Sequence, residues 1–187
     1  MAAIIKVESG GNPWAIGDNT AGGRVSPTPR SIDEAAAKAL DLLRQGHSLD
    51  LGLAQINSNN LKAYNVSVRQ VFDPCTNVAV GSRILSKFYA KSVEKYGEGE
   101  VSLYQALSAY NTGSFYRGHD YVMKILAAAG SKANVSNVAW KQPAEKSKGA
   151  IGQKLVYKPF NSPIIALNSQ GQYSMGLNST NGILALR

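Results

Sequence analysis

Four short segments of this 187-residue sequence place a carboxylate, side-chain amides and a tyrosine beside glycines. They are Glu8–Gly11, Gly52–Asn57, Asp73–Asn77 and Ala109–Gly113. Glu8 follows an apolar stretch, and burial of a carboxyl group raises its pKa, so that it keeps a proton near neutral pH. A glutamate at a helix end is more often solvated, so Glu8 alone is weak evidence for a catalytic acid. Taken together, the segments predict an acid-driven site for a neutral, polyhydroxylated substrate.

The amides and the tyrosine each have a chemical and a structural interpretation. Gln55 and Asn57 flank Ile56; if Ile56 packs inward, both amides can face a cleft and bind hydroxyl and N-acetyl groups. Alternatively, they satisfy backbone groups of their own loop. Tyr110 ends a helix beside Asn111 and Gly113, where its hydroxyl can orient a carboxylate. The alternative is a core tyrosine with its hydroxyl reaching out.

The elements that must position these residues are mainly helices. Residues 2–9 are expected to form a short helix closed by Gly10 and Gly11. Residues 17–30 are rich in Gly, Pro and Thr, which predicts a loop or small hairpin. Ser31 and Glu34 form a capping box that begins a helix ending near Gly46.

The second half of this region predicts three more helices. Asp73 is a good N-cap and Pro74 suits the first helical position, so a helix is expected up to Tyr96. Further helices are expected over 100–111 and 119–129. No alternating strand of any length is evident before residue 130, so the fold is expected to be mainly α.

The composition changes after Gly130. Residues 131–187 carry seven basic residues against one acid, a net charge of +6, whereas residues 1–130 carry +2. We expect a domain over 1–130 and a basic, flexible tail over 131–187 with short apolar segments. A basic excess favours polyanions without choosing among them, and a solvated tail without a partner stays an equal alternative.

Other chemistries are poorly supported. Cys75 lacks a histidine that would activate it and is expected to be a core thiol. His47 and His119 are too isolated for a metal site, so no metal and no cofactor are expected. No apolar run is long enough to span a membrane. The tail lacks the interleaved aromatic residues of single-strand binders, so no nucleic acid is expected.

The order Glu-Ser-Gly, Gly-Leu-Ala-Gln-Ile and Ala-Tyr-Asn-Thr-Gly resembles the soluble lytic transglycosylases of the lysozyme-like, goose-type fold. The resemblance covers residues 2–127. The segment 50–57, the loop and helix over 20–46 and the start at Asp73–Asn77 are similar to the transglycosylases of type IV secretion and conjugation systems. Ala54 departs from the wider family, which often has methionine there.

The resemblance implies roles for individual residues. Glu8 would be the catalytic acid and later the base; Gln55 and Asn57 would line the sugar cleft. Tyr110 would orient Glu8, with Asn111 nearby. The supporting residues would be Ser9, Gly52 and Gly113.

The implied reaction cuts the β-1,4 bond between MurNAc and GlcNAc in peptidoglycan and leaves a 1,6-anhydro ring. It needs one acid, and no second acid lies in a matching motif; Asp18, Asp33 and Asp50 are candidates by proximity only. Glycan strands would be the substrate, secretion subunits would contact the tail, and the site of action would be the periplasm. No signal peptide is expected from the pattern of the first residues, and a truncated amino terminus is expected.

Three alternatives stay open. A goose-type hydrolase would use water on the same substrate and give a product heavier by one water. A wall-binding assembly module would keep the fold without catalysis, and substitution of Glu8 would change nothing. A nucleic-acid binder rests on charge alone.

Overall fold

The computed structural model describes residues 1–131, 135, 138, 140, 165–167 and 173–175. The chain divides into two compact units, Met1–Ile151 and Gly152–Arg187. The first unit holds all four segments singled out from the sequence. Most of the predicted tail lies outside the described residues, so a boundary at residue 130 stays a prediction.

The first element, α1, spans Ala2–Ser9 as expected. It ends because Gly10 adopts a left-handed conformation, with φ of 64°, which glycine reaches without a Cβ clash. Ile4 is buried, whereas Val7 and Glu8 are half-buried. The helix therefore carries Glu8 at its last turn with an apolar face toward the protein.

A small antiparallel sheet follows, of which the sequence predicted only a loop or small hairpin over residues 17–30. Its strands are β1 (Ile16–Asp18), β2 (Gly23–Arg24), β3 (Leu49–Leu51) and β4 (Ile56–Asn57), in the order β2-β1-β3-β4. Asp50 stands opposite Gly17 on one side and Asn57 on the other. Strands of two or three residues are too short to show the alternation that identifies strands in a sequence.

Helix α2 (Ile32–Arg44) covers this sheet, and its start follows the predicted cap. The Ser31 hydroxyl accepts a hydrogen bond from the Glu34 amide at 3.1 Å. The Glu34 carboxylate accepts from the Arg30 amide at 2.8 Å, one residue before the position expected for a reciprocal capping box. The apolar face of α2 joins Leu49, Leu51 and Ile56 in one core.

Three short 3-10 helices lead from the sheet to the longest helix. They are η1 (Ser58–Asn60), η2 (Lys62–Tyr64) and η3 (Gln70–Phe72). Helix α3 spans Pro74–Tyr96, and the Asp73 side chain caps it by accepting from the Thr76 amide at 2.8 Å, as predicted. Cys75 is exposed on its first turn, so the expectation of a core thiol is wrong.

Helices α4 (Glu100–Thr112) and α5 (His119–Ala128) complete the helical part. Their apolar faces form a second core with Ile4 of α1. Val135 and Val138 are buried in this same core, so described residues beyond Gly130 pack against the helices.

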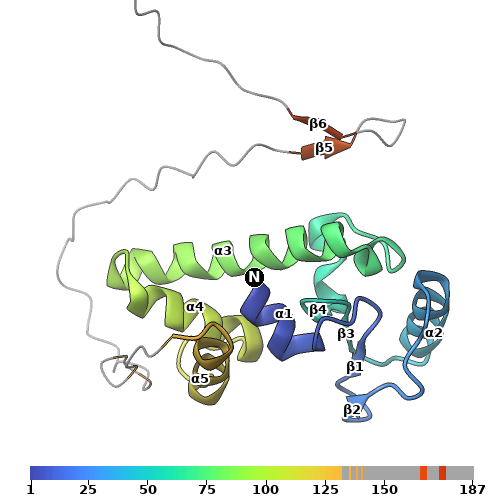
Figure 1. Ribbon diagram of the computed structural model, residues 1–187, viewed down its shortest axis with the longest axis horizontal. Helices are drawn as coiled ribbons and strands as arrows, with labels where there is room; N and C mark the ends of the chain where they lie inside the picture. Colours follow the sequence, from blue (N-terminus) through green and yellow to red (C-terminus); the bar gives the residue numbers. More distant parts are fainter. Residues whose placement is uncertain (132–134, 136–137, 139, 141–164, 168–172, 176–187) are drawn as a thin grey trace, which may run out of the picture. The chain divides into compact units, whose positions relative to one another are not determined.

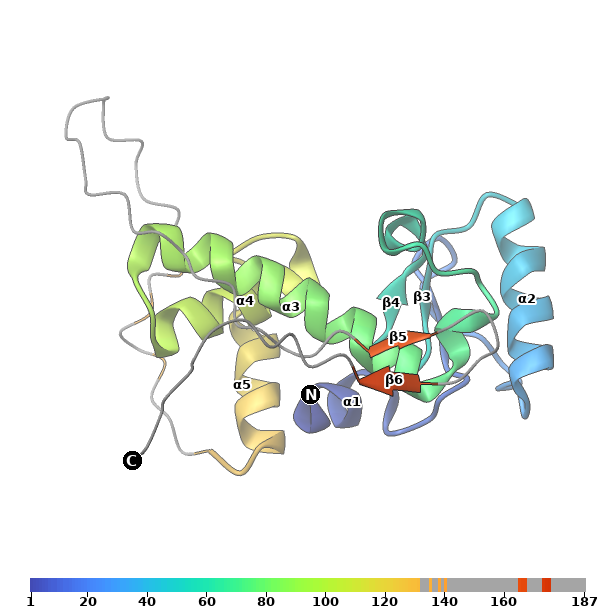
Figure 2. The same ribbon diagram turned by 90° about the horizontal axis from the view of Figure 1, so that it is seen from above.

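Figures 1 and 2 show how α3 joins these parts of the first unit. The sheet and α2 lie toward one end of α3, whereas α4 and α5 lie toward the other, with α1 between them. This mainly helical arrangement agrees with the predicted fold class. None of the helices in the described residues combines the length and apolar character needed to cross a membrane.

The second unit contains one described hairpin. Strand β5 (Ile165–Leu167) pairs antiparallel with β6 (Tyr173–Met175). The predicted flexibility of the tail and its other apolar segments lie outside the described residues.

Candidate active site

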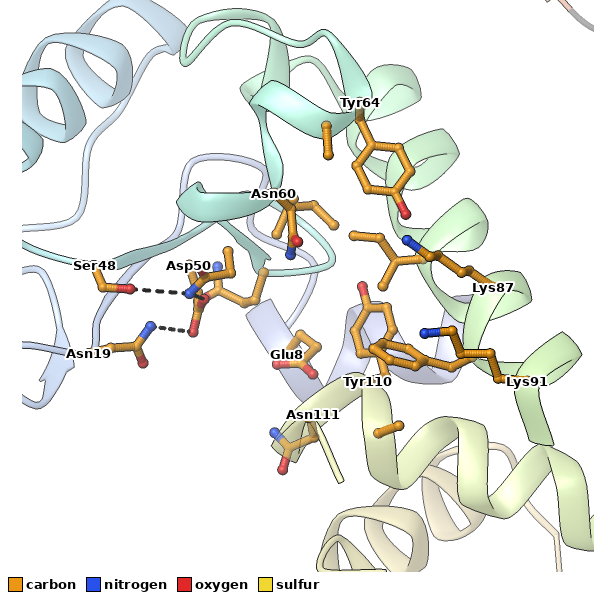
Figure 3. Close-up of a pocket in the computed structure, with 18 residues that line it drawn as sticks. Glu8, Asn19, Ser48, Asp50, Asn60, Tyr64, Lys87, Lys91, Tyr110 and Asn111 are labelled. Atoms are coloured by element: carbon orange, nitrogen blue, oxygen red, sulfur yellow. Dashed lines mark hydrogen bonds between the residues drawn. The ribbon is translucent and has the colours of Figure 1, made fainter. Parts of the chain in front are cut away.

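A hollow of about 600 Å³ lies between the sheet and α3, with Glu8 at its edge. Figure 3 shows Glu8 beneath the opening, Asp50 on the sheet side and Tyr110 on the helical side. A second hollow of about 390 Å³ is lined by Glu8, Gln55 and Tyr121 among others. Glu8 therefore lines both hollows, so its carboxyl group is accessible to a ligand occupying either one.

Burial and three neighbouring groups act on the protonation of Glu8. Burial raises the pKa of its carboxyl group above the ordinary value of 4.5, and this is the largest effect. The hydrogen bond from Tyr121 lowers that pKa, the negative charge of Asp50 raises it, and the positive charge of Arg24 lowers it. The net pKa is raised, which favours a carboxylic acid able to donate a proton.

Tyr121, from α5, makes the direct contact to Glu8. Its hydroxyl donates to Glu8 Oε1 at 2.5 Å, and burial raises the pKa of the Tyr121 phenol far above its usual range, so it stays a donor. On the other side, the guanidinium of Arg24 donates to the main-chain oxygen of Glu8. The side chain and the backbone of Glu8 are thus each held by a separate partner.

The predicted partner of Glu8, Tyr110, has a different contact. Its hydroxyl donates to the Ala54 carbonyl at 2.8 Å, and burial raises the pKa of this phenol as well. The predicted hydrogen bond from Tyr110 to Glu8 is therefore wrong. The phenol that donates to Glu8 belongs to Tyr121. Tyr110 still lines the hollow and ties α4 to the loop that contains Ala54.

The loop from Gly52 to Gln55 forms a tight wall of the site. Gln55 adopts a left-handed backbone with φ of 48°, which is uncommon for a residue other than glycine. Its side-chain nitrogen donates to the carbonyls of Gly52 at 2.8 Å and Ala15 at 3.2 Å. Gln55 lines both hollows, but its amide N–H groups serve the loop backbone, as the structural alternative expected.

The side chain of Asn77, on α3, holds this loop in place through hydrogen bonds to backbone groups. The side chain is 1% exposed, accepts from the Ala54 amide at 2.7 Å and donates to the carbonyls of Leu51 at 2.9 Å and Val71 at 2.7 Å. Gly52 makes room for it, since a Cβ at that position would lie 2.3 Å from Asn77 Nδ2. Gly52 therefore allows the close approach of Asn77 to the loop.

Asp50 faces the hollow with both carboxylate oxygens bound. Oδ1 accepts from Asn57 Nδ2 at 2.8 Å, and Oδ2 accepts from Asn19 Nδ2 at 2.9 Å. Asn57 also donates to Ser48 Oγ at 3.3 Å and accepts from the Asn59 amide at 3.1 Å. The Asn57 amide thus fixes Asp50 in addition to lining the cleft.

The remaining residues predicted for the site line the hollows or stabilise helix ends. Asn111 is exposed and lines both hollows. Gly113 ends α4 with φ of 69° and lines the larger hollow. Ser9 accepts from the Gly11 amide at 3.2 Å and donates to the Ile5 carbonyl at 3.1 Å, which fits the structural role expected for it.

The sequence does not predict a role for Tyr121, and it indicates Asp50 as a candidate second acid by proximity only. Tyr121 belongs to an apolar helix face with Val122 and Ile125, and that pattern predicts a side chain packed in the hydrophobic core. Asp50 sits on a strand too short to be predicted, and only the strand pairing brings Asn57 beside it. The described residues hold no cluster of His, Cys, Asp or Glu side chains suited to a metal ion.

This arrangement can deliver a proton to a ligand in the hollow and take one back. Glu8 is half-buried, held by one phenol and open to both hollows. Asp50 presents a negative charge across the opening, where it can interact with positive charge that develops in a ligand. Such a site suits acid-catalysed cleavage of a bond that spans the two hollows.

Comparison with known proteins identifies the family of this chain. Residues 1–120 match the family model described as "Transglycosylase SLT domain". The chain is 42% identical over 137 residues to the type IV secretion system protein virB1 of Brucella abortus, covering 69% of this chain and 57% of that protein. It is 38% identical over 131 residues to protein virB1 of Agrobacterium fabrum, covering 69% and 52%.

The chain thus spans little more than half the length of these curated relatives. No solved structure matches it significantly. The matched residues include Glu8, the loop from Gly52 to Gln55 and Tyr110, and they end one residue before Tyr121. On this coverage and identity, the chain belongs to the transglycosylase SLT domain family.

Proposed function

We propose that this protein is a lytic transglycosylase that cleaves the β-1,4 bond between MurNAc and GlcNAc in peptidoglycan. The single observation that carries the proposal is the Glu8 carboxyl group, whose pKa burial raises and which lies where two hollows meet. The family match supports the substrate class.

The reaction proceeds with Glu8 as the only proton carrier. Protonated Glu8 gives its proton to the bridging oxygen as the bond from that oxygen to C1 of MurNAc breaks. The acetamido group of the same sugar stabilises the positive charge at C1. The C6 hydroxyl oxygen then bonds to C1, Glu8 takes the hydroxyl proton, and a 1,6-anhydro ring closes.

Tyr121 and the burial of Glu8 have separate effects on this acid: the first orients the carboxyl group and the second raises its pKa. The Tyr121 phenol fixes the position of one carboxyl oxygen. Burial raises the pKa of Glu8, which favours its protonated form before the reaction and makes the carboxylate a stronger base after it. This single group can therefore serve both steps without a second acid in the cleft.

The names of the relatives support a cellular setting for the proposed activity. Because virB1 of Brucella abortus is named as a type IV secretion system protein, we propose that this chain opens the wall locally for such a system. Its place of action would be the periplasm, where peptidoglycan lies, and its partners would include secretion subunits.

Asp50 favours one second candidate, a hydrolase acting on the same bond. A carboxylate across the cleft from the acid can activate or orient a water molecule that attacks C1. The two reactions differ in their products, because hydrolysis adds one water and the transglycosylase adds none.

Mass spectrometry of soluble products from purified peptidoglycan tests the proposal. We expect muropeptides ending in anhydro-MurNAc with the parent protein and none with Glu8→Gln. Products heavier by one water would assign the hydrolase instead. Wall binding without soluble products from the parent protein would indicate the non-catalytic assembly module.

A further inference from the structure

Helix α3 carries a row of basic residues along one face. Arg83, Lys87, Lys91 and Lys95 follow one another at intervals of four residues, close to one helical turn. Glu94 is the only acidic residue within Pro74–Tyr96. Like charges at this spacing repel and destabilise a helix, so helix stability gives no reason for the row.

The two ends of the row have partners within the protein. The Arg83 guanidinium lies over the Tyr64 ring, 5.7 Å from its centre. Lys95 lies 5.3 Å from the centre of the Tyr96 ring, and its Nζ donates to the Tyr116 hydroxyl at 3.1 Å. Cation–π contacts and a hydrogen bond therefore account for both ends.

The two middle lysines have no such partner. Lys87 and Lys91 are exposed and line the same hollow as Glu8. The ion pairs among the described residues involve other basic groups, so no carboxylate lies within 4.0 Å of either lysine there. Figure 3 shows both side chains on the α3 wall of the opening, across from Asp50 and Ser48.

The opposite wall already offers groups suited to neutral sugars. Asn19 and Ser48 line the sheet side beside Asp50. The side-chain oxygen of Asn19, whose amide nitrogen donates to Asp50, and the hydroxyl hydrogen of Ser48, whose oxygen accepts from Asn57, can bind sugar hydroxyls without needing a charge. Two unpaired ammonium groups add attraction for an anion. A glycan reaching this wall would therefore be bound more tightly if it carried carboxylates.

We propose that Lys87 and Lys91 bind carboxylate groups of the stem peptides carried by MurNAc, so that the cleft selects peptide-bearing glycan over neutral glycan. This inference rests on the proposed function, since it assigns a feature of the same substrate. Lysine suits the task because its flexible stem lets one ammonium follow carboxylates at different positions. The exposed position of both lysines at the rim favours groups that project away from the sugar ring.

Binding measurements in the Glu8→Gln background test this, because cleavage then does not interfere. Three glycan ligands of matched length are compared: one with stem peptides, one whose carboxylates are converted to neutral amides, and one whose stems are removed by an amidase. We expect the first to bind about tenfold more tightly than the other two. That preference should shrink as salt is raised.

The substitutions Lys87→Gln and Lys91→Gln together should abolish the preference for the first ligand. Arginine at both positions should preserve most of it, because the charge remains. The control is Lys38→Gln with Arg44→Gln on α2, which removes two exposed charges that do not line the hollow, one of them ion-paired with Asp41. Thermal unfolding of every variant checks that the fold is kept.

Three results would overturn the inference. One is an unchanged preference after both lysines are replaced. Another is an equal loss in the α2 control, which would mean that net charge acts without a site. The third is equally tight binding of the stem-free glycan, whose remaining lactyl carboxylate would then be sufficient. The parent protein is assayed separately for anhydro products, so failure of the proposed reaction is distinguished from failure of this selectivity.

Discussion

The helical and sheet sides of the cleft each present one carboxyl group, in contrasting surroundings. Glu8 stands at the end of an apolar helix with a single phenol on its side chain, and its pKa is raised by burial. Asp50 stands on a strand, and two neutral amides donate to its two oxygens. The same functional group is thus prepared for proton transfer on one side and for carrying negative charge on the other.

This contrast also links the two sides. The negative charge of Asp50 raises the pKa of Glu8, so the sheet side strengthens the acid on the helical side. The loop between them is held by Asn77 of α3, which connects the wall of the cleft to the longest helix.

Replacing Glu8 by Gln should remove the proton donor while keeping its shape. Proton transfer by a positioned group contributes about 10²–10⁴-fold, and here one group serves both steps. We expect kcat/KM for release of soluble products to fall by at least about 10²-fold. Glycan binding and the unfolding midpoint should stay close to those of the parent. Activity above a tenth of the parent would contradict the assignment of Glu8.

Replacing Asn77 by Ala should detach the cleft loop from α3. Three backbone groups would lose their buried partner, and each unsatisfied group costs about 1–3 kcal/mol unless water replaces it. We expect the free energy of unfolding to fall by about 3 kcal/mol. Urea denaturation measures this loss, and faster hydrogen exchange at the Ala54 amide reports the loop. A change below about 0.5 kcal/mol would mean that the loop is held by other contacts.

Replacing Tyr121 by Phe should change both the rate and its pH dependence. The hydrogen bond from Tyr121 lowers the pKa of Glu8, so its loss raises that pKa further. Glu8 donates only when protonated, so the alkaline limb of kcat/KM should move to higher pH. Loss of orientation should lower kcat about tenfold at the optimum.

The matched control for Tyr121 is Tyr110→Phe. The Tyr110 hydroxyl donates to the Ala54 carbonyl, so its loss should cost about 0.5–1.5 kcal/mol of stability without moving the alkaline limb. A larger pH shift in the Tyr110 variant than in the Tyr121 variant would restore the role predicted from the sequence.

Replacing Asp50 by Asn should shift the alkaline limb of kcat/KM in the direction opposite to that expected for Tyr121→Phe. Removing the negative charge lowers the pKa of Glu8, because Asp50 raises it. The alkaline limb should therefore move to lower pH, by less than the Tyr121 change, since the Asp50 contribution to the pKa ranks below that of Tyr121. Opposite shifts in the two variants would show that both sides of the cleft act on one acid.

Much of the fold could be predicted because its signals are local. Ser31 and Asp73 cap the helices that follow them through hydrogen bonds spanning three residues. Gly10 ends α1 through its own backbone conformation. These choices depend on neighbours in the sequence, which a single sequence displays directly.

The sheet and the partner of Glu8 could not be predicted because they depend on distant pairing. Leu49–Leu51 becomes a strand only by pairing with Ile16–Asp18, more than thirty residues earlier. Tyr121 reaches Glu8 across 113 residues, and within its own helix it resembles a core side chain. The sequence could nominate Glu8 as an acid, but it could not name the groups that set its pKa.

Direct titration of the Glu8 carboxyl group most clearly tests the contrast between the two sides of the cleft. Nuclear magnetic resonance of glutamate carboxyl carbons, with Glu8→Gln to assign the resonance, gives this pKa in the folded protein. Glu8 should titrate clearly above 4.5, its ordinary value, and the value should rise in Tyr121→Phe and fall in Asp50→Asn. A Glu8 pKa at or below 4.5 would contradict the conclusion that burial prepares this residue as the proton donor.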